Sequence, residues 1–220
     1  MLRDVLLETD NKDNLIIVTT FSSHIARLKA IIEFGKKLNR KILFLGRSLA
    51  KYVKAAEKIG IVGFSKDIEM VKYSRQIERR LKKVDKDRKK YMLVVTGHQG
   101  EHKSVLYKIA KKEFKFNLYP EDNVIFSCRT IPTPTNIANR DALENELKQT
   151  GVRIFKDIHQ SGHAAREDLR DFIHIIKPKN IIPAHGNKEM REALAELAEE
   201  MGYKIGENVI MLKDGSKVAL

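Results

Sequence analysis

The sequence predicts an α/β fold in which a mainly parallel sheet is flanked by helices. Short β-branched runs alternate with longer segments of helical periodicity, which is the order of a βαβ fold. The expected strands are apolar along their length, as strands buried on both faces are. Gly60, Gly151 and Gly202 follow three of the helical segments and are typical helix stops.

The elements follow one another in a regular order. The expected strands are short apolar runs at residues 15–18, 41–45, 91–95, 123–128, 152–155 and 180–183. The expected helices repeat apolar residues every three to four positions, at residues 21–38, 49–59, 69–84, 103–111, 137–150, 164–176 and 188–201. Asp214-Gly215 separates two further runs, 208–213 and 216–220, and predicts a β-hairpin with a tight turn.

Composition favours a folded intracellular chain. Of the 220 residues, 42% are hydrophobic, which excludes a disordered chain. Apolar runs such as Leu15–Val18 are too short to cross a bilayer, and acidic residues near the start argue against a signal peptide. Cys128 is the only cysteine, which excludes an internal disulfide and a Cys-cluster zinc site. We therefore expect a cytoplasmic protein that does not enter a membrane.

Basic residues are concentrated in the first part of the chain. Residues 1–120 hold 28 Lys and Arg against 13 Asp and Glu, whereas residues 121–220 hold 14 against 16. The densest stretch, residues 72–90, has ten cations and three acids. A solvated helix face is the ordinary interpretation of such a run, but the asymmetry favours a surface for a polyanion, nucleic acid first. A membrane surface is less favoured because no helix pairs this face with a strong apolar stripe.

A change of composition near residue 150 indicates a domain boundary. Proline-containing turns precede it, and histidine and glycine become concentrated after it. We therefore divide the chain into residues 1–150, which are basic, and residues 151–220.

Two histidine motifs follow expected strands in the second part. The segment HQSGH at residues 159–163 opens a helix, where backbone N–H groups and the helix dipole attract anions. Its histidines suit phosphate binding, proton transfer or metal binding; the ordinary alternative is a serine helix cap with two loop histidines. His185 lies at the carboxyl end of the next expected strand, where α/β sheets collect ligands. The two motifs predict one shared site.

Two glycine-bearing turns in the basic part extend this pattern. The segment TGHQGE at residues 96–101 follows an expected strand but lacks the Gly-Lys-Ser/Thr ending of a phosphate-binding loop. His98 and His102 suit a metal, although a polar loop is the more ordinary interpretation. The segment LGRS at residues 45–48 makes a similar turn, in which Arg47 suits a phosphate group. The sequence has no His-x-His-x-Asp-His cluster, so the residues alone do not predict a complete metal site.

In this order, the motifs resemble the β-CASP family of metallo-β-lactamase-fold nucleases, and within it the archaeal type of RNase J. The resemblance covers almost the whole chain, through residues 18–27 (VTTFSSHIAR), 45–48, 96–101, 124–132, 159–164 (HQSGHA) and 183–186 (PAHG). It implies a β-CASP domain in residues 1–150 and, in residues 151–220, the closing strands and helices of a metallo-β-lactamase domain. It also implies hydrolysis of RNA phosphodiesters, from the 5′ end or internally, at a two-zinc site between the domains.

The resemblance gives each matching residue a role. It makes His163 the catalytic residue, which assists proton transfer and contacts the scissile phosphate, and it makes His185 a zinc ligand. It places the terminal phosphate or nucleotide of the RNA at Ser161, Gly162 and Ala164, and His159, beside them, is expected to contribute to the same phosphate site. Asn187 and His98 depart from the family, where Glu and Ser are common, so fine specificity stays open. A homodimer is expected because the family often dimerises.

The resemblance further implies that the chain is a C-terminal portion. In the family, the β-CASP domain is inserted into the metallo-β-lactamase domain, whose first part carries the main zinc ligands. We therefore expect this polypeptide alone to be a poor nuclease that still binds RNA. Two other functions stay open: a non-catalytic RNA- or DNA-binding module, and a Rossmann-like nucleotide or sugar-phosphate domain that uses residues 46–48 and 161–164.

Overall fold

The computed structural model describes residues 2–7, 13–156, 158, 164 and 166–219, which fall into two compact units, Met1–Gln160 and Ser161–Leu220. The strands are β1 (Ile16–Thr19), β2 (Lys41–Leu45), β3 (Ile68–Val71), β4 (Tyr91–Val95), β5 (Asn123–Phe126) and β6 (Arg153–Phe155). The α-helices are α1 (Leu2–Leu7), α2 (Ile25–Lys37), α3 (Arg47–Lys58), α4 (Ser74–Val84), α5 (Val105–Ala110), α6 (Pro134–Gln149), α7 (Arg166–Ile176) and α8 (Lys188–Glu200). Two 3-10 turns are η1 (Phe64–Lys66) and η2 (Arg88–Lys90). None of the described helices combines the length and the hydrophobicity that crossing a bilayer requires.

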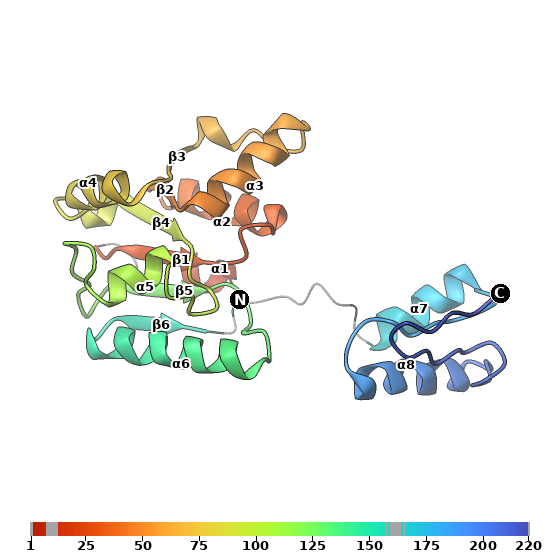
Figure 1. Cartoon of the computed structure of the whole chain (residues 1–220). Helices are drawn as coiled ribbons and strands as arrows, with labels where there is room; N and C mark the ends of the chain where they lie inside the picture. Colours follow the sequence, from red (N-terminus) through yellow and green to blue (C-terminus); the bar gives the residue numbers. More distant parts are fainter. Residues whose placement is uncertain (1, 8–12, 157, 159–163, 165, 220) are drawn as a thin grey trace. The chain divides into compact units, whose positions relative to one another are not determined.

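The first unit is built on a six-stranded sheet in the order β3-β2-β4-β1-β5-β6 (Figure 1). Every neighbouring pair of strands is parallel. In the central strand β1, Ile17 lies opposite Leu93 of β4 on one side and opposite Val124 of β5 on the other. The predicted α/β fold, a parallel sheet flanked by helices, is confirmed.

Successive residues of a strand pack on opposite faces of this sheet, as the pleat requires. On one face, Ile17 belongs to a buried cluster with residues of α4, α5 and α6. On the other, Ile16 and Val18 belong to a cluster with residues of α1, α2 and α3. Because both faces are covered, neither set of alternating positions needs to be polar. This is why the central strands are continuous apolar runs.

Residues 69–84 form a strand and a helix, so the single helix predicted there is wrong. β3 ends at Val71, and α4 begins three residues later and buries Ile77, Leu81 and Val84. The helical periodicity therefore belongs to α4 alone. β3 is the terminal strand of the sheet, beside β2, and it accommodates the exposed Glu69 in its middle. Its apolar pattern is too short and too interrupted to be separated from the helix that follows.

The second unit contains α7 and α8 with the segments beside them. Its buried core consists of Ile173, Ile181, Ala195, Ala198 and Val209. Arg166 and Arg170 of α7 each form an ion pair with Glu200 at the end of α8, both at 2.7 Å. The two helices are thus joined by apolar packing and by an exposed cluster of charges.

The C-terminal segment makes a turn but not the predicted hairpin, because none of the described residues 208–219 belongs to a strand. Gly215 has φ +81° and a backbone hydrogen bond closes the turn, as the Asp-Gly pair predicts. The backbone of the segment pairs instead with Ile181, which forms a single parallel bridge to Val209. A two-stranded hairpin buries little by itself, whereas this pairing buries Val209 completely. The strand predicted at 180–183 is reduced to this one bridge.

Candidate functional site

Polar loops gather at the carboxyl edge of the sheet in the first unit. Because the strands are parallel, the segments that follow β1 to β5 emerge at one edge, where α/β sheets bind their ligands. These segments are residues 20–24, 46–48, 72–74, 96–104 and 127–129. Both turns singled out in the basic part of the sequence, at Arg47 and at residues 96–101, are among them.

Direct contacts join three of these loops. The hydroxyl of Ser22, after β1, lies 3.0 Å from the hydroxyl of Ser48, after β2. The ring of Phe21 meets the ring of His98, after β4, edge to face with the centroids 4.2 Å apart. The ends of β1, β2 and β4 therefore form one continuous surface.

Gln99 holds the loop after β4 against the loop after β5. It is 4% exposed, and its amide nitrogen donates to the Arg129 carbonyl (3.0 Å) while its amide oxygen accepts from the Ile131 N–H (2.8 Å). Beside it, Gly100 has φ +78° and lies directly against the backbone of Asn139 in α6. Gln99 could not be distinguished in the sequence, where its only signal is a polar residue inside a glycine-bearing turn.

Arg140 fastens the same loop from α6. It is 3% exposed; its guanidinium donates to the His98 carbonyl (2.8 Å) and forms an ion pair with Glu144 (2.9 Å). The guanidinium carbon also lies 3.3 Å from the centroid of the Phe126 ring. Lys156, after β6, contacts the second carboxylate oxygen of Glu144 (3.0 Å). The buried Arg140–Glu144 pair thus holds the loop after β4 against α6, and no local sequence pattern predicted this pair.

Cys128, two residues after the end of β5, is buried in surroundings that favour the neutral thiol. Burial, only partly offset by Arg140, raises the pKa of its thiol to about 12. The thiol stays protonated near neutral pH, and the thiolate is the reactive form.

The imidazole of His98 is kept neutral by its surroundings. Burial lowers its pKa below the ordinary value of 6.5; the Glu101 carboxylate opposes this shift and the Arg140 cation adds to it. The Glu101 oxygen lies 3.5 Å from Nδ1 of His98. The ring therefore fills space between the loops instead of adding to the positive charge of the edge.

This pKa shift predicts a loss of stability in acid. Below its ordinary pKa, His98 takes up a proton more readily in the unfolded chain than in the folded one, so stability falls as pH falls. We expect the unfolding temperature to decrease from about pH 7.5 to about pH 5.5, and to decrease less in His98→Gln. Circular dichroism melts of both proteins at the two pH values measure the difference. An identical pH dependence in the two proteins would contradict this role of His98.

The structure describes only some of the residues that were predicted to take part in hydrolysis. Arg47 is the first residue of α3 and is exposed at the carboxyl edge of the sheet. His185 is exposed in the second unit, two residues before Asn187, whose side chain caps α8 by accepting from Met190 N–H (3.0 Å). Ala164 is exposed, two residues before α7. The other predicted residues, His159, Ser161, Gly162 and His163, lie outside the described residues, so the expected approach of His163 to His185 stays a prediction.

Within the described residues, the donors do not fit a metal ion by themselves. His185 is the one predicted ligand there, and no group of three or more His, Cys, Asp or Glu side chains is placed to hold a metal. His98 packs on Phe21, and His102 packs edge to face on Tyr107, with the centroids 4.8 Å apart. Both rings therefore have packing roles.

The ten cations of residues 72–90 divide into two groups. Four are paired with carboxylates: Arg80 with Glu69, Arg88 with Asp85 and Asp122, Lys89 with Asp13, and Lys90 with Asp87. Of these, Arg88 is structural, since it also lies against the rings of Phe116 and Tyr119. The other six have no ion pair among the residues that the structure describes: Lys72, Arg75, Arg79, Lys82, Lys83 and Lys86. A positive surface remains along α4 and the residues on either side of it.

Comparisons with known proteins agree with this arrangement. Residues 13–145 match the family model described as "Ribonuclease J, beta-CASP domain", and residues 142–211 match "Zn-dependent metallo-hydrolase RNA specificity domain". Ribonuclease J of Methanocaldococcus jannaschii is 45% identical over 98% of this chain and 48% of its own length. Ribonuclease J of Pyrococcus abyssi is 42% identical over 100% of this chain and 48% of its own, and that of Mycoplasma genitalium is 34% identical over 93% and 35%. The chain thus spans about half the length of its archaeal relatives.

Proposed function

Because the chain belongs to the ribonuclease J β-CASP family, we propose that it is the RNA-holding portion of a metal-dependent ribonuclease. The observation that carries this proposal is the positive surface of residues 72–90, where six cations have no carboxylate partner among the described residues. Phosphate groups of a single strand are the natural counter-charges for such a surface. The family match does not favour the alternative of a Rossmann-like nucleotide-binding domain.

We assign the β-CASP role to residues 1–150 and the closing part of the metallo-hydrolase domain to residues 151–220. Zinc is proposed as the metal because the family model matched by the second part is described as Zn-dependent. His185 is proposed as one ligand, His163 as the residue that moves a proton at the scissile phosphate, and His159, Ser161, Gly162, Ala164 and Arg47 as phosphate contacts. The homodimer and the cytoplasmic location stay predictions.

Single-stranded RNA is expected to bind the 220-residue chain with a steep dependence on salt. Neutralising about five phosphates gives a slope of about −3.5 in log K against log salt, or roughly 100-fold weaker binding at 200 mM than at 50 mM. Fluorescence anisotropy of a labelled 5′-hydroxyl oligonucleotide at four salt concentrations measures the slope. Binding that does not change with salt would refute RNA holding by this surface.

Hydrolysis is tested with the same chain and a 5′-monophosphorylated, end-labelled RNA in the presence of zinc or manganese. Since the described donors do not complete a metal site, we expect the RNA to be bound but left uncut. His163→Ala is the control for a contaminating nuclease, because activity that survives this change does not come from the proposed site. If the wild-type chain cleaves the RNA and His163→Ala does not, the chain assembles a working metal site. The proposal that this chain holds RNA without cutting it would then be wrong.

A further inference from the structure

A cavity of about 340 Å³ lies at the carboxyl edge where β2, β3 and β4 end. Its lining comes from the three loops, from the first turns of the helices that follow them, and from Phe114 after α5: Gly46, Arg47, Lys72, Tyr73, Ser74, Ile77, Thr96, Lys103, Val105, Lys108 and Phe114. Ile77, Val105 and Phe114 are buried and give the cavity an apolar floor. Its volume is in the range of pockets that hold a small ligand or one unit of a polymer.

The charge of this cavity is of one sign. Arg47, Lys72, Lys103 and Lys108 line it, and no lining residue is acidic. None of the four cations forms an ion pair within the part of the chain that the structure describes. A fifth basic side chain is close by, because the interaction with Lys54 lowers the pKa of Lys72. The positive charge gathered here has no compensation among the described residues.

Polar groups of suitable type complete the lining. Ser74 supplies a hydroxyl, and Tyr73, which is 60% exposed, supplies a phenol and an aromatic ring. Thr96 is fixed in place, because its hydroxyl oxygen accepts from the Val105 N–H (3.1 Å). Hydroxyls and ammonium groups above an apolar floor are the donors with which proteins bind a phosphate group, and an exposed ring offers a stacking surface to a base.

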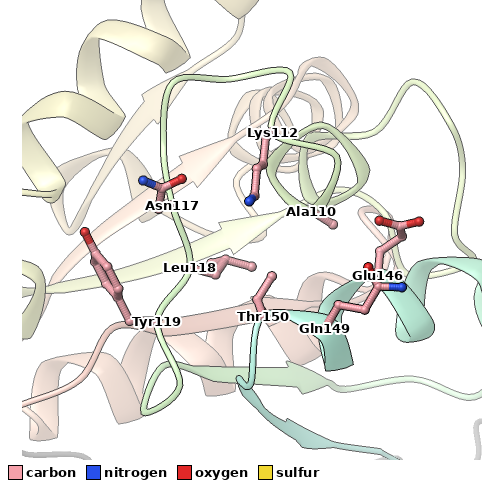
Figure 2. A pocket seen from close by; sticks show the side chains of 8 residues that line it. All are labelled: Ala110, Lys112, Asn117, Leu118, Tyr119, Glu146, Gln149 and Thr150. Carbon is pink, nitrogen blue, oxygen red and sulfur yellow. The ribbon is translucent and has the colours of Figure 1, made fainter.

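A second pocket, at the opposite edge, shows that this charge is not general to the fold. Figure 2 shows that pocket, about 410 Å³ in volume, between the ends of α5 and α6 and the loop before β5. Its lining includes Lys112, the carboxylate of Glu146 and the amides of Asn117 and Gln149. Glu146 forms an ion pair with Lys111. A pocket of mixed charge and neutral amides gives no preference for an anion, in contrast to the cavity at the carboxyl edge.

We propose that the cavity lined by Arg47, Lys72, Lys103 and Lys108 binds a phosphate group of an RNA strand. The choice of a strand rests on the proposed function and on continuity, because Lys72 is both a lining residue and the first cation of the 72–90 surface. One nucleotide of the bound strand occupies the cavity, and its neighbours continue along α4. The cavity thereby fixes the path of the strand at the end of the sheet occupied by β2 and β3.

The test compares two double variants of the 220-residue chain with equal loss of charge. Lys72→Gln/Lys103→Gln removes two cations of the cavity. Lys41→Gln/Lys58→Gln removes two exposed cations at the opposite edge, since Lys41 begins β2 and Lys58 ends α3. Anisotropy with a 5′-hydroxyl oligonucleotide reports internal phosphodiesters, titration with adenosine monophosphate reports a free phosphate, and thermal melts verify that both variants fold.

We expect the cavity variant to bind RNA at least about tenfold more weakly and to lower the salt slope by about 0.7, the value for one single-strand phosphate, with less than threefold loss in the control. Equal losses in the two variants would overturn the proposal, since only net charge would then matter. If the cavity variant loses binding of the mononucleotide but binds RNA as the wild type does, the cavity is a phosphate site, and the proposal that the phosphate belongs to an RNA strand is overturned. A different result would be that the wild type does not bind RNA, while the wild type and the control variant bind the mononucleotide and the cavity variant does not. The proposed function would then be wrong, but the cavity would still be a phosphate site.

Discussion

Gly100→Ala is expected to lower the free energy of unfolding by about 3 kcal/mol, the sum of left-handed strain and forced displacement of packed backbone. A β-carbon at this position would lie 2.2 Å from the Asn139 carbonyl oxygen and 2.6 Å from the Arg140 nitrogen. Those atoms belong to the backbone of α6, so they cannot rotate away as a flexible side chain does. The clash can be relieved only if the loop after β4 moves away from α6. This movement would also strain the hydrogen bonds of Gln99.

Gly60→Ala is the matched control, because it isolates the conformational part of this effect. Gly60 has φ +74°, close to the +78° of Gly100, but a β-carbon there would have no heavy atom within 4 Å among the described residues. We expect this variant to lose about 1 kcal/mol, the strain of a left-handed alanine alone. Urea unfolding followed by circular dichroism gives both values. If both variants lost the same free energy of unfolding, the close approach of residue 100 to α6 would contribute nothing to the effect.

Arg140→Met is expected to cost about 3–5 kcal/mol, because it leaves the Glu144 carboxylate in the interior without its main partner. Glu144 is 6% exposed and Arg140 is 3% exposed. Lys156 also contacts Glu144, but half of the Lys156 side chain is in solvent, so it replaces little of the lost interaction. The carbonyl of His98 loses its buried donor at the same time.

Two further variants test whether the cost of Arg140→Met comes from leaving a buried carboxylate unpaired. Adding Glu144→Leu to Arg140→Met removes the buried carboxylate, and we expect it to restore more than half of the lost stability. Arg166→Met breaks an ion pair with Glu200 on an exposed surface and is expected to cost no more than about 1 kcal/mol. A double-mutant cycle, with each free energy of unfolding measured in urea, gives the coupling energy between Arg140 and Glu144. No recovery in the double variant would mean that Arg140 stabilises the fold by packing on Phe126 and not by pairing with Glu144.

The parallel sheet was predictable because its strands are covered on both faces and therefore consist of continuous apolar runs such as Leu15–Val18. β3 was not predicted, because an edge strand leaves Glu69 exposed and shows no such run. The C-terminal turn was predicted from Asp214-Gly215, but the pairing was not. Local residues specify a turn, whereas the choice between a hairpin and the bridge to Ile181 depends on a distant segment.

The candidate site was predictable to the extent that it consists of loops after strands. Arg47 and the turn at residues 96–101 were found in that way, and the structure places both at the carboxyl edge. Lys103 and Lys108 were not found, because nothing in a lysine's neighbours along the chain shows that it will line a cavity with a residue 56 positions earlier, as Lys103 does with Arg47. Arg140 was hidden for the same reason, since its partners Phe126 and His98 are distant in sequence.

The order of the strands also determines when the first unit can fold. β1 is central, yet its two neighbours are β4 and β5, and the contacts Thr19 to Val95 and Thr20 to Ser127 span 76 and 107 residues. On the ribosome, β1 therefore has neither of its native neighbours until more than half of the unit has been synthesised. Such a topology makes folding slow, because large loops must close before the central contacts form. Until then, both edges of β1 lack the strands that hydrogen-bond to them in the folded unit.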